Sequence, residues 1–227
     1  MSSSSHDLQL YDHLLRFQLF QGLSRAELLQ MAGNTKFGFL KMPTGKTLEK
    51  AGNPCSRLSF LISGQLTLST QSDDGGYCVV EQLSAPWLIQ PEVLFGSQSR
   101  FTGTWQTQSE CHFITLSKDE VMRLLDDFLI IRLNLLNQLS TLAQRRAHLS
   151  WRRAPQTLRE RIVRFFVDHS TYPAGSKQFL ILMTRLADEV GDSRLKVSHV
   201  LNQMQTEGQI SLHRGRIEVP LLESLLM

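Results

Sequence analysis

The chain has 227 residues, which is enough for one or two domains that each bury a core of their own. With 41% hydrophobic and 20% charged residues, its composition is that of an ordinary soluble globular protein. No apolar run approaches the length of about 20 residues that spans a bilayer. The segment 1–5 lacks the basic and apolar regions of a signal peptide, so we expect a cytoplasmic protein.

Three scattered cysteines, Cys55, Cys78 and Cys111, are too few for a disulfide framework, and none forms a C-x-x-C pair. We therefore expect reduced thiols, no metal site and no resident cofactor. The chain also lacks a phosphate-binding glycine loop, an H-E-x-x-H motif and a G-x-S-x-G motif, so the sequence does not predict an enzyme.

The net charge of +3 is unevenly distributed along the chain. Residues 1–143 contain 11 Lys and Arg against 13 Asp and Glu, whereas residues 144–227 contain 13 against 8. A basic C-terminal third attached to an acidic remainder is the distribution expected if only that third contacts nucleic-acid phosphates.

The first two thirds of the chain change from helical to strand patterns. Residues 8–33 have helical spacing, and Ser24 with Glu27 predicts a capping box at the start of a second helix. From about residue 36 to residue 116, short alternating segments are separated by glycine turns, as at 73–76. Strands are expected at 58–62, 65–70, 77–80 and 112–116. Many short strands with regular turns favour a sandwich or a jelly-roll barrel.

A long helix is predicted after Ser117, because Ser117 and Glu120 predict a second capping box and no glycine or proline occurs from Asp119 to Ala154. An apolar or small side chain recurs at alternating spacings of four and three, as in the seam of a dimeric coiled coil. The seam consists of Leu129, Leu133, Leu136, Ser140, Ala143 and Ala147. A second stripe of Leu135, Leu139 and Leu142 suits packing on the chain's own barrel. The alternative is a helix that packs only within its own domain.

The segment 182–204 predicts a helix-turn-helix. Thr184 is expected to cap the first helix, Gly191 to end it, and Ser193 to cap the second. Val197, Val200, Leu201 and Met204 form the buried stripe of that second helix, which follows an earlier helix with Ile162, Phe165 and Phe166 buried. Residues 208–219 then predict a two-stranded wing with a basic tip, and the tail 220–227 is expected to pack back on this domain.

Apart from Leu195, the residues left on the outer face of the second helix are polar or basic, as a recognition helix requires. A structural helical hairpin with a β-ribbon is the alternative, but the exposed Arg and Lys lie on the second helix and favour DNA. The candidate DNA-binding residues are Thr184, Ser193, Arg194, Leu195, Lys196, Ser198, His199, Asn202, His213, Arg214 and Arg216.

The whole chain resembles the Crp/Fnr (catabolite activator/fumarate-nitrate regulator) family of bacterial transcription regulators. The specific part of the resemblance is the run from Thr184-Arg185 through Val190-Gly191 and Ser193-Arg194 to Val200-Leu201, followed by 208–211. A looser part covers 20–23, Gly45, Gly64 and 90–107. The resemblance implies an α+β fold in which a cyclic-nucleotide-binding-like jelly-roll barrel (1–117) precedes a dimerisation helix (118–150) and a winged helix-turn-helix (151–227).

By this resemblance the protein is a homodimeric, sequence-specific transcription regulator that binds a palindromic operator on double-stranded DNA. The resemblance also implies RNA polymerase as a partner and no association with a membrane. Arg194 and His199 fall at base-reading positions, and we expect Arg194 to pair with a guanine and Lys196 with a phosphate. Leu195 stands where the best-known members have a glutamate, so the half-site should differ from theirs.

The effector site implied by the resemblance is incomplete. Glu92, Arg100 and Thr102 are its candidate residues, but Pro91 replaces a glycine and Phe101 separates Arg100 from Thr102. These departures argue against a cyclic-AMP site and favour another small-molecule effector or none. Three cysteines do not suit the four-cysteine cluster of oxygen-sensing members, and His112, the barrel histidine, is expected to face solvent and to bind no haem.

Two functions of other classes compete with a DNA-binding regulator. The first is a cyclic-nucleotide-binding module that regulates a protein partner; the segment 184–204 with its wing argues against it. The second is an enzyme on a cupin-like barrel, which needs clustered histidine and carboxylate ligands, whereas residues 36–116 contain a single histidine.

Overall fold

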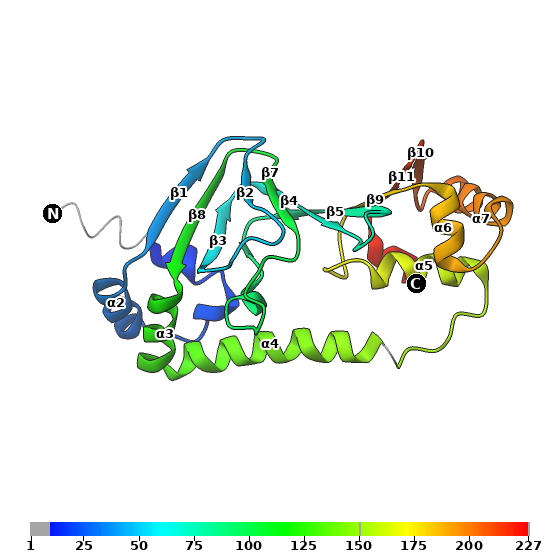
Figure 1. Cartoon of the computed structure of the whole chain (residues 1–227). Helices are drawn as coiled ribbons and strands as arrows, with labels where there is room; N and C mark the ends of the chain where they lie inside the picture. Colours follow the sequence, from blue (N-terminus) through cyan, green and yellow to red (C-terminus); the bar gives the residue numbers. More distant parts are fainter. Residues whose placement is uncertain (1–9, 150, 227) are drawn as a thin grey trace.

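The computed structural model describes residues 10–149 and 151–226. The predicted helix start at residue 8, the predicted boundary at residue 150 and the last residue, 227, lie outside the described residues. The molecule is elongated, with a β-barrel at one end and a small helical domain at the other, and helix α4 (Leu129–Leu149) runs along one side (Figure 1).

The N-terminal helical segment is divided into three pieces. Residues 10–14 are helical, a 3-10 turn covers Gln18–Phe20, and α2 covers Arg25–Asn34. The predicted capping box is confirmed: Ser24 accepts a hydrogen bond from the Glu27 N–H, and the Glu27 carboxylate accepts one from the Ser24 N–H at 2.7 Å. These pieces close one side of the barrel, since Leu14 and Phe20 are fully buried in its core.

The barrel is built from antiparallel strands, and the predicted strands are all present. One sheet has the order β1-β8-β3-β6 (Gly38–Met42, Cys111–Ser117, Arg57–Ser63 and Trp87–Leu88). The other contains β5 (Tyr77–Ser84), β4 (Gln65–Gln71), β7 (Thr104–Thr107) and β2 (Thr47–Glu49). Phe60 and Phe113 from the first sheet and Trp105 from the second share one core. The β4–β5 hairpin turns at Gly75, whose φ of 69° requires the left-handed conformation.

The prediction of one unbroken helix after Ser117 is wrong. Only half of the predicted capping box forms: the Ser117 hydroxyl accepts from the Glu120 N–H, but the Glu120 carboxylate accepts from the Lys36 N–H. Helix α3 ends at Asp127, and α4 begins at Leu129. Phe128 between them has an extended backbone (φ −124°, ψ 101°), and its side chain is buried in the barrel core. The Arg132 side chain donates to the carbonyls of Leu125 (2.7 Å) and Asp126, which closes the end of α3.

Helix α4 has two different faces, and the predicted barrel-facing stripe is confirmed at Leu135 and Leu139, whereas Leu142 lines a cavity. Leu135 is buried and Leu139 packs against the barrel core, while the Asn134 amide donates to the Leu19 and Gln21 carbonyls. The opposite face is exposed. Its predicted seam contains Leu129, Leu133, Leu136, Ser140, Ala143 and Ala147, each of them exposed.

The C-terminal domain is a helix-turn-helix with a wing. Its elements are α5 (Leu158–Asp168), β9 (Lys177–Ile181), α6 (Met183–Val190), α7 (Arg194–Thr206), β10 (Ser211–His213), β11 (Arg216–Val219) and a 3-10 turn at Leu222–Leu226. The core includes Phe166, Ala187 and Leu201, and buried Leu222 confirms that the tail packs back. Gly191 ends α6 in the left-handed conformation, as predicted. Thr184 is not the cap of α6, because the helix already begins at Met183 with Leu182 before it.

Strand β9, which the sequence did not predict, joins the two ends of the molecule. It pairs with β11 of the wing on one side and with β5 of the barrel on the other. A single seven-stranded sheet, in the order β10-β11-β9-β5-β4-β7-β2, therefore runs from the barrel into the winged domain. The two parts are joined by this strand pair as well as by the segment that follows α4.

Candidate nucleic-acid interface

Hydrogen bonds fix the start of α7. The Ser193 hydroxyl accepts from the Lys196 N–H at 3.4 Å, which confirms Ser193 as the cap. Asp192 accepts from the Ser193 N–H at 2.9 Å and forms ion pairs with Arg161 (2.7 Å) and Lys196 (3.2 Å). The Ser193 N–H, followed by these cations, holds the pKa of Asp192 below its ordinary value. The first turn of α7 is thus held to α5 through Arg161.

The predicted recognition face of α7 is available to a partner. Val197, Leu201 and Met204 are buried on the inner side, as the stripe predicted, and Val200 is partly buried. On the outer side, Leu195 is 83% exposed. The remaining candidates on this helix are exposed or half-buried: Arg194, Lys196, Ser198, His199 and Asn202.

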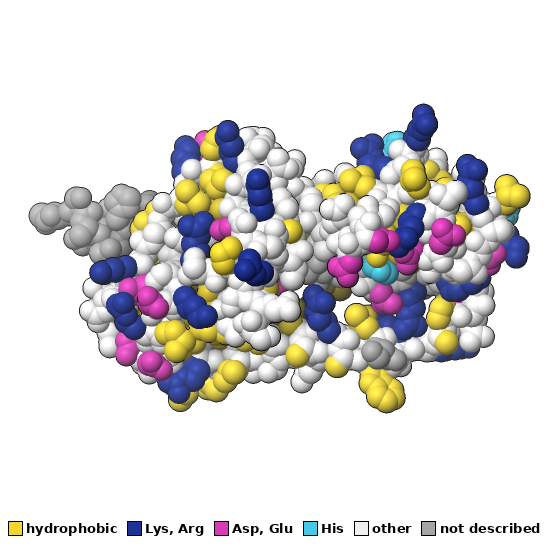
Figure 2. Space-filling view, in the orientation of Figure 1, with side chains coloured by type: hydrophobic (Ala, Val, Ile, Leu, Met, Phe, Trp, Pro, Cys, Tyr) yellow, Lys and Arg dark blue, Asp and Glu magenta, His cyan; other side chains and the backbone are white. Residues whose placement is uncertain are grey.

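The structure brings residues from both helices of the helix-turn-helix and from the wing around one groove of about 450 Å³. The groove lies between the starts of α6 and α7 and the wing strands β10 and β11. Five of the predicted DNA-binding residues line it, namely Thr184, Arg194, His213, Arg214 and Arg216. Lys and Arg side chains are visible over the wing and the outer end of this domain (Figure 2).

The cations of this surface differ in how they are held. Arg216 pairs with Glu218 at 3.1 Å, and His213 lies 3.5 Å from the same carboxylate. Arg194 and Arg214 form no ion pair with any described residue. Because these two guanidinium groups have no acidic partner to give up, they can bind a phosphate or a guanine edge at the lowest cost.

The three candidate effector residues of the barrel do not form one site. Glu92 lies in a 3-10 turn (Pro91–Val93) and lines one cavity, whereas Thr102 lines another. The exposed Arg100 side chain instead donates to the Gly52 carbonyl at 2.7 Å. The resemblance predicted this group from residues close in sequence, but the three side chains lie in two separate cavities and at the Gly52 carbonyl.

Gln90 occupies the stretch where the resemblance implies a phosphate cradle. It is buried and has a left-handed backbone, with φ 35°. The Trp105 indole N–H donates to its side-chain oxygen at 3.2 Å, and its amide nitrogen donates to the Thr102 hydroxyl. The side chains of Gln90, Thr102 and Trp105 therefore bond to one another, and Thr102 has a protein partner in place of a ligand.

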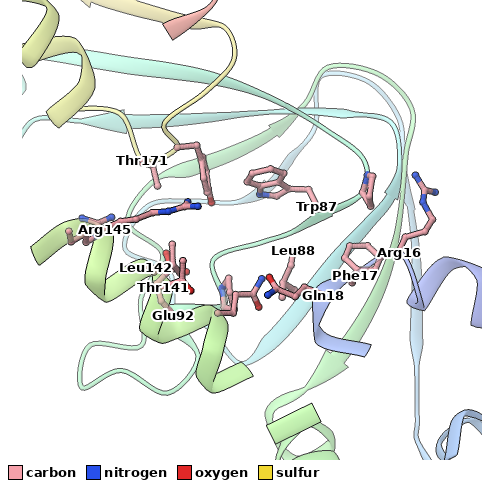
Figure 3. Close-up of a pocket in the computed structure, with 15 residues that line it drawn as sticks. Arg16, Phe17, Gln18, Trp87, Leu88, Glu92, Thr141, Leu142, Arg145 and Thr171 are labelled. Carbon is pink, nitrogen blue, oxygen red and sulfur yellow. The ribbon is translucent and has the colours of Figure 1, made fainter. Parts of the chain in front are cut away.

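A cavity of about 460 Å³ lies between the barrel, α4 and the loop before β9 (Figure 3). Glu92 and Trp87 face it from the barrel, and Arg145 and Arg146 from α4. Burial raises the pKa of Glu92 above its ordinary value, against the opposing effects of a backbone N–H and Arg146. Sequence patterns did not predict a role for the two arginines and Trp87; the adjacent Arg145 and Arg146 near the end of a predicted dimer helix were the available signal.

The remaining expectations concern cysteine, histidine and the membrane. Cys55, Cys78 and Cys111 are free thiols. His112 is partly exposed on β8, where its ring lies 3.2 Å from Glu110. Among the described residues, no group of three His, Cys, Asp or Glu is placed to hold a metal ion, and no helix is long and apolar enough to cross a membrane.

The fold and this surface together define a class of protein: a jelly-roll barrel joined by a long helix to a winged helix-turn-helix. No protein-family model and no curated protein matches the chain. Among solved structures, the catabolite activator protein of Thermus thermophilus aligns with TM-score 0.50 and 19% identity, covering 92% of this chain and 97% of that chain.

Two further solved structures align with the chain. The sensor domain of the transcriptional regulator DNR from Pseudomonas aeruginosa aligns with TM-score 0.53 and 22% identity, covering 62% of this chain and 93% of that chain. A second Thermus thermophilus protein, a transcriptional regulator of the CRP/FNR family, aligns with TM-score 0.44 and 21% identity, covering 83% of this chain and 96% of that chain. The chain has the fold of the two structures that align with TM-scores of 0.50 and 0.53, and the α+β architecture expected from the resemblance is confirmed.

Proposed function

We propose that this protein is a sequence-specific DNA-binding transcription regulator of the Crp/Fnr type. The observation that carries the proposal is the groove between α6, α7 and the wing, around which Arg194 and Arg214 stand without acidic partners among the described residues. A winged helix-turn-helix inserts its second helix in the major groove, so the exposed face of α7 supplies the base contacts. The barrel (1–117), the connecting helices (118–150) and the winged domain (151–227) are proposed as sensor, dimer and DNA-binding parts.

The exposed stripe of α4 supports a homodimer with two parallel copies of that helix. A two-fold dimer binds a pseudo-palindromic operator with half-sites about one helical turn apart. We assign a guanine contact to Arg194 and a phosphate contact to Lys196. The exposed Leu195 side chain suits contact with a thymine methyl group. RNA polymerase is a proposed partner of the DNA-bound dimer.

Salt dependence of DNA binding tests this function. The probe is a duplex recovered from random-sequence DNA by selection on the wild-type protein. Each phosphate contact adds about −0.9 to the slope of log affinity against log salt, so a steep slope is expected. Arg194→Ala should weaken binding by about 5- to 150-fold, the range of one bidentate base contact, and should relax the preference at one base pair.

Lys50→Ala is the matched control, because Lys50 is an exposed cation on the barrel. It should leave both affinity and slope unchanged. A flat salt response of the wild-type protein would exclude the proposed function. An Arg194→Ala protein with unaltered base preference would exclude the guanine contact alone.

The cavity of Figure 3 is the proposed effector site, and its chemistry favours an anion. Arg145 and Arg146 supply two cations against the one carboxylate of Glu92, whose pKa is raised by burial, and the Trp87 ring supplies an apolar wall. A ligand at 100 times its dissociation constant stabilises the native state by about 2.7 kcal/mol, a shift of several degrees in thermal unfolding. We expect hits among phosphorylated or carboxylated metabolites and none with cyclic AMP.

Arg145→Gln should lose that thermal shift, while Arg123→Gln on α3, an exposed cation outside the cavity, should keep it. A hit that is neutral or cationic, or one that Arg145→Gln retains in full, would contradict this site.

A further inference from the structure

The joint between the barrel and the winged domain contains a buried ion pair. Strands β5 and β9 pair over five residues, from Tyr77↔Ile181 to Glu81↔Lys177. At the last of these pairs, the Lys177 ammonium lies 3.1 Å from the Glu81 carboxylate, with side-chain exposures of 0% and 1%. Charged residues are almost never buried this fully unless they are paired. Each of the two residues can therefore stay buried only while the barrel and the winged domain remain in contact at this point.

Further hydrogen bonds complete the environment of both charges. Glu81 accepts from the N–H groups of Thr171 (2.8 Å) and Tyr172 (3.0 Å), and Lys177 donates to the Ala174 carbonyl at 2.7 Å. Each charge therefore has several partners, and one strand of the barrel holds the whole loop before β9. This is the geometry in which a buried pair fixes one arrangement of two parts.

The β4–β5 hairpin makes a second set of contacts with the winged domain. The Arg185 guanidinium of α6 forms an ion pair with Asp74 at 2.8 Å and lies over the Tyr77 ring. Tyr77 also meets Phe165 of α5 edge to face, with centroids 5.4 Å apart. The hairpin thus contacts α5, α6 and β9, whereas the covalent connection is the single segment after α4.

The joined arrangement leaves the DNA-binding surface open. Helix α7 lies at the end of the molecule away from the barrel (Figure 1). Of the residues paired between β5 and β9, Ile181 lines the groove beside the wing, where its side chain is buried. The joint thus orients α7 without covering it.

We propose that Glu81 and Lys177 are positioning residues that hold the winged domain, through the β5–β9 joint, in the orientation that binds two DNA half-sites. The proposal rests on the proposed function. Two loosely tethered domains would lose orientational freedom when both bind one duplex, and that loss weakens binding; a joint formed beforehand removes it. Binding to a single half-site requires no fixed orientation and is independent of the joint.

An engineered disulfide across the joint tests the proposal. Cys78 of β5 lies directly opposite Leu180 of β9. Directly opposed residues of an antiparallel pair have Cα atoms about 4.5–5.5 Å apart, within the range that a disulfide bridges. Leu180 is exposed, and the other cysteines, Cys55 and Cys111, are buried and do not compete. Oxidised Leu180→Cys therefore fixes the joined arrangement, and the reduced protein is its own control.

The probes are the duplex selected by the wild-type protein and a duplex with one of its half-sites. Lys177→Gln should weaken binding to the two-half-site duplex by about tenfold and leave the half-site affinity unchanged. Adding oxidised Leu180→Cys to Lys177→Gln should restore the lost affinity. Asp74→Asn, on the exposed hairpin, should give a smaller loss of the same kind and keeps the test open if Lys177→Gln fails to fold.

Loss of two-half-site binding in the oxidised Leu180→Cys protein would overturn the proposal, because the joined arrangement would then exclude DNA. An unchanged ratio of two-half-site to half-site affinity in Lys177→Gln and Asp74→Asn would overturn it too. A wild-type protein that binds neither duplex removes the proposed function itself, and with it the positioning role. A wild-type protein that binds while the variants behave otherwise than expected removes only the positioning role.

Discussion

Lys177→Met is expected to destabilise the joint between barrel and winged domain by about 3–5 kcal/mol, the cost of leaving one partner of a buried ion pair without its counterion. Methionine fills much of the lysine volume, so packing is largely kept and the loss is electrostatic. The Glu81 carboxylate keeps its bonds from the Thr171 and Tyr172 N–H groups, but no cation then offsets its burial.

The chain can relieve this cost by separating the two parts rather than by unfolding. Separation exposes Glu81 to water, so the observed loss cannot exceed the free energy that holds the joint together. We therefore expect faster hydrogen exchange at the β5–β9 ladder, over 77–81 and 177–181, with little change for barrel core amides such as those of Phe60 and Phe113.

Lys50→Met, at an exposed barrel position, is the matched control and should leave exchange in the ladder unchanged. Uniformly faster exchange throughout the barrel of Lys177→Met would show that the pair supports the whole fold and not the joint. Unaltered exchange in the ladder would show that the pair contributes little to holding the two parts together.

Local patterns predicted the parts of the fold that local interactions determine. Alternating strands, the glycine turn at Gly75 and the caps Ser24 and Ser193 are each set by neighbouring residues, and the structure has them where the sequence places them. The DNA-binding candidates behave in the same way. They come from one continuous stretch of sequence, and five of them line one groove, while most of the others lie on the outer face of α7.

The features that the sequence analysis missed or predicted wrongly depend on contacts between residues distant in sequence. Phe128 fits a helical pattern, yet it leaves the helix because its ring is buried in the barrel core. Strand β9 begins with a lysine, a residue type that is usually exposed, and the counterion that permits its burial, Glu81, lies 96 positions earlier in the chain. Arg100, predicted from a short sequence resemblance to line a ligand site, instead binds the Gly52 carbonyl.

Leu136→Glu is expected to convert the proposed dimer to a monomer. Leu129, Leu133 and Leu136 are 63%, 46% and 53% exposed on α4, on the side away from the barrel. Fully burying one leucine stabilises by about 1.5–3 kcal/mol, and a two-fold axis counts each substitution twice. Two facing glutamates add repulsion, so the dissociation constant should rise more than about 100-fold.

Sedimentation equilibrium across nanomolar to micromolar concentrations measures this change directly. Asn137→Glu is the matched control, since it adds the same charge to the neighbouring exposed position outside the seam. If Leu136→Glu remained dimeric, the α4 stripe would not be the interface. If it became monomeric, its affinity for the two-half-site duplex should fall to that for one half-site. The β5–β9 joint lies within one chain, so it should survive in the monomer, and the dimer and the joint can be separated as two distinct requirements for operator binding.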